Sequence, residues 1–147
     1  LVANMIFRIV FLLFFTHLSL ADNIINGTYK EMFENGLPKY EITYKNSKKH
    51  GKEIFWFDSG VKKMESHYID GIENGYWRQW HKNGSIKLEV NYTNGKKDGL
   101  WQQWYTDGKL RSSVQFIGGT KHGKELMFRP NGSIISEEYY IDGKVVK

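Results

Sequence analysis

D-G-L-W-Q-Q-W-Y-T-D-G-K-L-R-S-S-V-Q-F-I-G-G-T-K-H, residues 98–122, is one copy of a unit that recurs without insertion along most of the chain. Glycines mark its period, because three interleaved series each repeat every 24 residues. The series are Gly27, Gly51, Gly75, Gly99 and Gly123; Gly36, Gly60, Gly84, Gly108 and Gly132; and Gly71, Gly95, Gly119 and Gly143, preceded by Ser47. A fixed period in this range indicates a repeat architecture.

The composition favours strands joined by turns. Aromatic residues make up 16% of the chain, and 15 glycines stand against 2 prolines; aromatics spaced regularly between glycines are typical of strands. The absence of cysteine excludes a disulfide framework, a thiolate metal site and a cysteine nucleophile. The formal charge of +5 is spread without a basic block, so nucleic acid is not an expected partner.

The N-terminal segment has the pattern of a secretory signal peptide. Met5 has the features of the translation start, which makes residues 1–4 upstream read-through or an alternative, non-native start. Arg8 supplies a basic n-region, residues 9–20 form an apolar stretch, and Ser19 and Ala21 place small residues at −3 and −1 of a cleavage site. The uncharged stretch is shorter than the roughly 20 residues that a membrane-spanning helix needs. We therefore predict a signal peptide over residues 1–21, cleaved after Ala21, and a secreted or periplasmic mature chain over residues 22–147. The alternative is an uncleaved anchor.

Each unit has the pattern of a strand, a turn and a second strand. With the first glycine of a unit as position 0, position 5 carries a large apolar residue: Met32, Trp56, Trp80, Trp104 and Phe128. Position 9 is glycine, preceded by Asn, Asp or Ser, which predicts a two-residue type I′ turn there. A longer glycine-containing turn is expected between units. The predicted fold is all-β: an elongated antiparallel β-meander of five 24-residue hairpin repeats, over residues 26–49, 50–73, 74–97, 98–121 and 122–147.

The second strand of each unit alternates between apolar and polar residues. In one copy the odd positions are Ile86, Leu88, Val90 and Tyr92, whereas the even positions are polar. This alternation predicts a sheet with one apolar and one polar face. The aromatic residue at position 5 is expected to join the apolar face.

The glycines and aromatics together form the motif D/N/H-G-x-W-x-x-W-x-x-N/D-G…Y-x-N/D-G-K-x-x-G, clearest in residues 74–97 and 98–121. This motif resembles that of the MORN-repeat family, and more closely its bacterial variant. The resemblance covers residues 26–143 and implies a meander that acts as an interaction or scaffolding module. Eukaryotic members of the family imply contact with membrane lipid, whereas bacterial variants often carry an antitoxin label. Glu53 and Glu125 depart from the aromatic expected at position 2, where the middle units carry Trp77 and Trp101.

Two charged series follow the second strand. Position 14 carries Glu65 and Glu89, and position 12 carries Lys63, Lys87 and Arg111. Both series are expected on the polar face, where they would form a charged docking surface, paired carboxylates for glycoside hydrolysis, or simply a solvated face of weak ion pairs. Repetition argues against catalysis, because an active site needs one distinctive constellation. We predict no enzyme activity, no catalytic residue and no cofactor.

Four tryptophans lie in two adjacent units. If positions 2 and 5 lie on opposite faces, Trp77 and Trp101 form an exposed pair while Trp80 and Trp104 pack the core. An exposed pair could stack on sugar rings or hold a quaternary ammonium by cation–π attraction. The alternative is that all four pack within the array.

The histidines do not form a metal-binding pattern. His50 and His122 occupy one repeat position, where other units have Asn74 and Asp98. This equivalence predicts polar residues at a turn rather than metal ligands, and no H-x-x-H spacing exists.

The predicted function is that of an exported, non-enzymatic repeat module for protein–protein or envelope interaction and scaffolding. Its partner is expected to be another protein or an envelope component, with membrane lipid as a further contact. Two alternatives remain open: a glycan- or choline-binding hairpin array that uses Trp77 and Trp101, and an antitoxin or immunity protein of a toxin pair.

Overall fold

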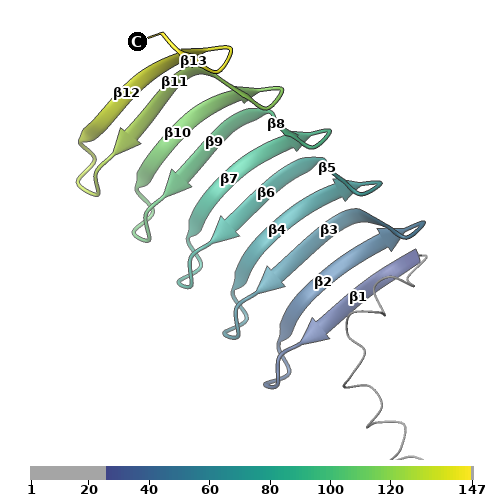
Figure 1. The fold of residues 1–147 in the computed structure, drawn as a ribbon. Helices are drawn as coiled ribbons and strands as arrows, with labels where there is room; N and C mark the ends of the chain where they lie inside the picture. The colour runs from purple at the N-terminus through teal and green to yellow at the C-terminus, as the bar shows by residue number, and fades with distance from the viewer. Residues whose placement is uncertain (1–25, 147) are drawn as a thin grey trace, which may run out of the picture.

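The computed structural model describes residues 26–146, which form one open antiparallel sheet of thirteen strands (Figure 1). The strands follow one another across the sheet in chain order, except that the short strands β5 and β8 pair only with β4 and β7, and the ribbon advances steadily from β1 to β13 (Figure 1). The strands are β1 (Asn26–Met32), β2 (Pro38–Lys45), β3 (Lys48–Trp56), β4 (Lys62–Ile69), β5 (Ile72–Glu73), β6 (Gly75–Trp80), β7 (Ile86–Thr93), β8 (Lys96–Lys97), β9 (Gly99–Trp104), β10 (Leu110–Ile117), β11 (Thr120–Phe128), β12 (Ile134–Ile141) and β13 (Lys144–Val145). The predicted all-β meander is confirmed. The predicted signal peptide lies outside the described residues.

The turn within each unit is not the predicted type I′ turn. Gly36 N–H donates to the carbonyl of Phe33, and Phe33 N–H donates to the carbonyl of Leu37, so three residues form the loop. Only the glycine has a positive φ there, 80° at Gly36. This is a type I turn followed by a left-handed glycine. Asn35 is in the loop because its Oδ1 accepts the N–H of Leu37 at 3.0 Å, an Asx turn.

The tight type I′ turns join the units instead. Asn46 and Ser47 have φ of 50° and 59°, and Asn94 and Gly95 have φ of 51° and 76°. In each case the flanking residues pair directly across two turn residues, as Thr93 and Lys96 do. The sequence-based assignment of the two turns was therefore reversed, because Asn-Gly and Asp-Gly suit both kinds of turn.

Tight turns of successive units are hydrogen-bonded to one another. Gly71 N–H donates to the carbonyl of Lys49, and Gly95 N–H donates to that of Glu73. The same bond recurs at Gly119 and Gly143. These bonds link one hairpin to the next along one margin of the sheet, so the five units stack in a regular register.

His50 and His122 were expected at turns, but they lie inside β3 and β11. The turn ends before each histidine, because Ser47 is followed directly by β3 and Gly119 directly by β11. Asn74 and Asp98 occupy the equivalent positions at breaks between β5 and β6 and between β8 and β9. The position therefore tolerates both a continuous and an interrupted strand.

The most buried residues form one row across the sheet. Ile42, Ser66, Val90 and Val114 are at most 2% exposed and share repeat position 15. In register they lie opposite position 2, since Trp77 pairs with Val90 and Trp101 with Val114. The apolar face of the second strand thus continues through positions 2 and 4 of the first strand. We call this side of the sheet the aromatic face.

The opposite side carries a row of mostly charged or polar residues, which we call the charged face. Direct pairing continues across the sheet through Lys30, Glu41, Ile54, Glu65, Arg78, Glu89, Gln102, Ser113, Leu126 and Glu137. Alternation along a strand puts successive side chains on opposite sides of a sheet, so this row lies on the side of the sheet opposite to the buried row.

A β-bulge in every unit changes which side the next residues occupy. Phe55 pairs with Met64 and Trp56 with Lys62, which leaves Lys63 as the extra residue. Lys87 and Arg111 are the extra residues of the following two units. An extra residue interrupts strict alternation, and this moves position 12 to the aromatic face and position 11, which pairs with position 5, to the charged face. Position 5 itself lies on the charged face by regular alternation along the first strand.

Candidate functional site

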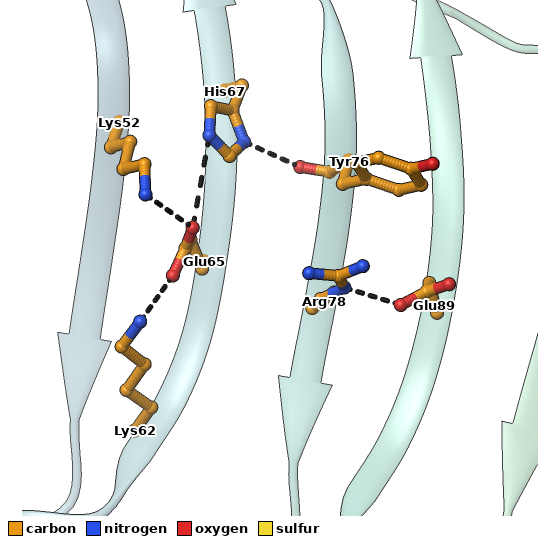
Figure 2. Close-up of polar contacts among 7 residues, drawn as sticks. All are labelled: Lys52, Lys62, Glu65, His67, Tyr76, Arg78 and Glu89. Carbon is orange, nitrogen blue, oxygen red and sulfur yellow. Dashed lines mark hydrogen bonds and ion pairs between the residues drawn. The ribbon is translucent and has the colours of Figure 1, made fainter.

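Glu65 is the centre of a polar cluster on the charged face (Figure 2). Its carboxylate lies 2.6 Å from Lys62 Nζ, 3.4 Å from Lys52 Nζ and 3.8 Å from His67 Nε2. Burial by itself would raise the pKa of Glu65, but the hydrogen bond and charge of Lys62, with the charge of Lys52, hold it below its ordinary value. The side chain is only 10% exposed, so this carboxylate is ionised and held rigidly in place.

The cluster continues into the next unit (Figure 2). His67 Nδ1 lies 3.1 Å from the carbonyl oxygen of Tyr76, and the Arg78 guanidinium forms an ion pair with Glu89. The guanidinium also stacks on the Tyr76 ring, 4.7 Å from its centroid. Glu65, Arg78 and Glu89 alternate in sign along one register row, so their charges attract across strands.

The charged face also carries the largest apolar side chains exposed near the middle of the array. Tyr76 is 52% exposed and Leu100 is 47% exposed. They occupy position 1 of consecutive units, where the flanking units have Lys52 and Lys124. An apolar centre with a charged surround is typical of protein-binding surfaces.

On the aromatic face, Trp77 and Trp101 are half-buried rather than an exposed pair. They lie opposite the buried Val90 and Val114, while Trp80 and Trp104 lie three residues further on and face the other side. All four tryptophans are half-buried. The expectation that position 5 packs the apolar face was therefore wrong, because positions 2 and 4 of the first strand face that side and alternation puts position 5 on the other.

The two charged series predicted on one face lie on opposite faces. Glu65 and Glu89 lie in the charged row, whereas position 12 points to the aromatic face. The contact of Lys39, at position 12 of the first unit, places this position on the aromatic face. Its Nζ is 3.2 Å from Glu31 Oε2, and Glu31 pairs with Tyr40 on the aromatic face. Lys63 and Arg111 lie over the rings of position 6 in their own units, Phe57 and Tyr105.

Glu53 replaces the aromatic of position 2 with a buried ionised cluster. It accepts hydrogen bonds from Lys49 Nζ at 2.7 Å, Tyr40 Oη at 2.9 Å and Ser66 Oγ at 3.3 Å. Burial opposes the charge of Glu53, but the bonds from Lys49 and Tyr40 outweigh it and lower its pKa. For Lys49, burial also opposes ionisation, and Glu53 raises its pKa above the ordinary value. Sequence periodicity could not identify this cluster, because Lys49 and Tyr40 come from the neighbouring unit.

Histidine pairs with aspartate at the unit-joining turns. His50 Nδ1 is 3.2 Å from Asp70 Oδ1, and His122 Nδ1 is 4.0 Å from Asp142 Oδ1. Asn74 and Asn94 make the equivalent contact in one of the two units between them, at 3.3 Å. Within residues 26–146 there is no group of three potential metal-ligating side chains.

A single-layer array of stacked hairpins with two differently built faces defines a repeat protein of the meander type. The family model described as MORN repeat variant matches the chain in five segments, residues 25–46, 49–70, 73–94, 97–117 and 121–142. Since these segments cover most of the chain, the protein belongs to the MORN repeat variant family. The resemblance seen in the sequence is confirmed. No curated protein matches the chain.

Membership supports a repeat module of a kind that often binds protein or membrane. In the part of the chain that the structure describes, no helix is long and apolar enough to cross a membrane.

Proposed function

We propose that this chain is an exported, non-enzymatic interaction module that binds another protein or an envelope component through its charged face. The observation that carries the proposal is the exposure of Tyr76 and Leu100 at equivalent positions of adjacent units. Aromatic and aliphatic side chains that are exposed together mark interaction surfaces, and such anchors contribute most of the binding energy when a partner covers them.

The polar cluster beside these anchors supports the same function. Lys52, Lys62 and His67 each already contact Glu65, so these side chains do not have to be ordered when a partner binds. Pre-organised side chains lower the entropic cost of association. The alternating charges of Glu65, Arg78 and Glu89 would set the register of the partner rather than the affinity.

Contact with anionic lipid is a second candidate, through the edge formed by the unit-joining turns. Ile69, Ile72 and Ile117 are about half exposed there, beside Lys48 and Lys96. Exposed apolar side chains beside lysines favour the surface of an anionic bilayer.

The test is affinity capture of the tagged protein from the envelope fraction of its own cells, read by mass spectrometry. Wild-type protein should recover one partner in stoichiometric amount, and Tyr76→Ser with Leu100→Ser should lose it. Lys124→Ser is the matched control, since it changes the same repeat position outside the apolar centre. Equal recovery with both variants would show that the charged face is not the binding surface, and recovery of lipid alone would favour the turn edge.

Export has its own measurement. The protein isolated from the producing cells should begin at Asp22 and be found outside the cytoplasm. An intact mass that includes residues 9–21, in protein from the cytoplasm, would contradict export and would favour the antitoxin alternative.

A further inference from the structure

The aromatic face brings together two tryptophans and three cations that no ion pair neutralises. Lys63, Lys87 and Arg111 are exposed, and among residues 26–146 none of them forms a salt bridge. They are the bulge residues of three consecutive units, and Trp77 and Trp101 lie on the same side of the sheet. We propose that this face binds a linear acidic polysaccharide with one carboxylate per disaccharide.

The ring surfaces suit a sugar. Trp77 and Trp101 are half-buried, and no second layer covers this side within the described residues. The C–H bonds of a pyranose carry partial positive charge, and the face of an aromatic ring is negative. Gln79 and Gln103 lie in the same face, each opposite Leu88, and supply amide donors and acceptors for hydroxyl groups.

The cations suit a polymer that carries a charge at a regular interval. Consecutive units are two strands apart, so equivalent side chains recur at about 9.6 Å. This interval is close to the length of a disaccharide in an extended β-linked polysaccharide, and longer than the ~6.7 Å of an extended dipeptide. A polyproline helix advances about 9 Å per turn, but the side chains of proline are uncharged and would leave the three cations without partners.

Changes at the flanking units limit the site to the middle of the array. Position 2 carries Glu53 and Glu125 on either side of the tryptophans, and each carboxylate is bound to a lysine of its own, Lys49 or Lys121. In the first unit Lys39 is neutralised by Glu31. The free cations and the tryptophans therefore coincide in the central units, over a length that fits about two to three disaccharides at the strand-pair spacing.

The experiment is a titration of tryptophan fluorescence with hyaluronan hexasaccharide, in which uronic acid alternates with a neutral sugar. It uses the full protein in the form that accumulates in the producing cells. Quenching should be saturable. Lys87→Gln with Arg111→Gln should weaken binding about tenfold, and Lys124→Gln, on the charged face, should leave it unchanged.

Two comparisons separate the ligand classes. Chitohexaose has the same ring stacking without carboxylates and should bind more weakly. Poly-glutamate and single-stranded DNA carry a charge on every residue and no pyranose ring, and should also bind more weakly. Trp77→Phe keeps an aromatic ring for folding and should change the amplitude of quenching. No saturable quenching, an equal loss with Lys124→Gln, or equal affinity for poly-glutamate or DNA would overturn the proposal.

Discussion

The buried carboxylate of Glu53 is the feature whose removal should cost most, and Glu53→Ala tests it. The side chain is 6% exposed and binds Lys49, Tyr40 and Ser66. The substitution removes one ion pair and leaves the hydroxyl of Tyr40 and the ammonium of Lys49 without their acceptor. Glu125→Ala is the matched control, because Glu125 occupies the same repeat position and pairs with Lys121 at the same i,i+4 spacing.

The magnitude follows from how much of the cluster can reach water. A buried hydroxyl left without a partner costs about 1–3 kcal/mol, and breaking a fully buried ion pair costs about 3–5 kcal/mol. Lys49 is 35% exposed and regains water in part, so the pair contributes less than that range. We expect Glu53→Ala to lower the free energy of unfolding by about 3 kcal/mol. Glu125 is 17% exposed, and its loss should cost about 1 kcal/mol.

The assay is guanidinium denaturation at neutral pH, followed by tryptophan fluorescence. The slope of the free energy against denaturant must be compared among the proteins, since a changed slope would mean that part of the array unfolds separately. Lys49→Met in the Glu53→Ala background should recover part of the loss, because an apolar side chain replaces the unpaired cation. Equal losses for Glu53→Ala and Glu125→Ala would refute the assignment of Glu53 as a buried, multiply bonded carboxylate.

Three further predictions follow from the same geometry. The pKa values of Glu53 and Glu65 are lowered in the fold, so each carboxylate stabilises the fold fully above the ordinary value of 4.5 and loses this contribution as the pH falls through its lower folded value. Thermal denaturation from pH 7 to pH 2 should therefore show a loss of stability in acid that Glu53→Gln diminishes. An undiminished loss of stability would contradict this. Ser47 has a φ of 59° where the other units have glycine, so Ser47→Gly should stabilise the fold by about 0.5–1 kcal/mol. This would be measured as a higher midpoint in denaturant, whereas an unchanged midpoint would show that the turn is unstrained. Trp101→Ala and Trp104→Ala should both destabilise, by about 2–3 kcal/mol each, because both rings are half-buried on opposite faces; a loss confined to Trp104→Ala in thermal denaturation would restore the original face assignment.

The architecture could be predicted from the sequence because it depends on period and alternation. Three glycine series in one register predict an array of stacked hairpins. The alternation of residue types from Ile86 to Tyr92 predicts an apolar and a polar side for the second strand. The first inference holds, since the spacing of the glycines along the chain equals the spacing of the units in the sheet. The second holds from Leu88 to Tyr92 but not at Ile86, which the bulge at Lys87 moves to the charged face, where it pairs with Trp80. The turn types could not be predicted from the sequence in the same way. Asn83 accepts the N–H of Ser85 through its side chain. The sequence does not distinguish an asparagine in this role from one whose backbone is left-handed.

The candidate surfaces could be predicted only as a set of residues, not as an arrangement. One bulge in each unit moves Lys63, Lys87 and Arg111 away from Glu65 and Glu89 and onto the side of Trp77 and Trp101. Nothing in the pattern of residue types shows a bulge, since the extra residue adds no glycine or proline. The bulge also changes the chemistry. Had the strands alternated regularly, lysine and glutamate would lie on one face and neutralise each other. Because they do not, the middle of the aromatic face keeps three cations without carboxylate partners among residues 26–146. We infer that the bulge is what gives this array two different binding faces, an apolar centre among paired charges on one side and aromatic rings among free cations on the other. A change that removed the bulge while keeping every hydrophobic residue in place should therefore preserve the sheet and abolish acidic-polysaccharide binding.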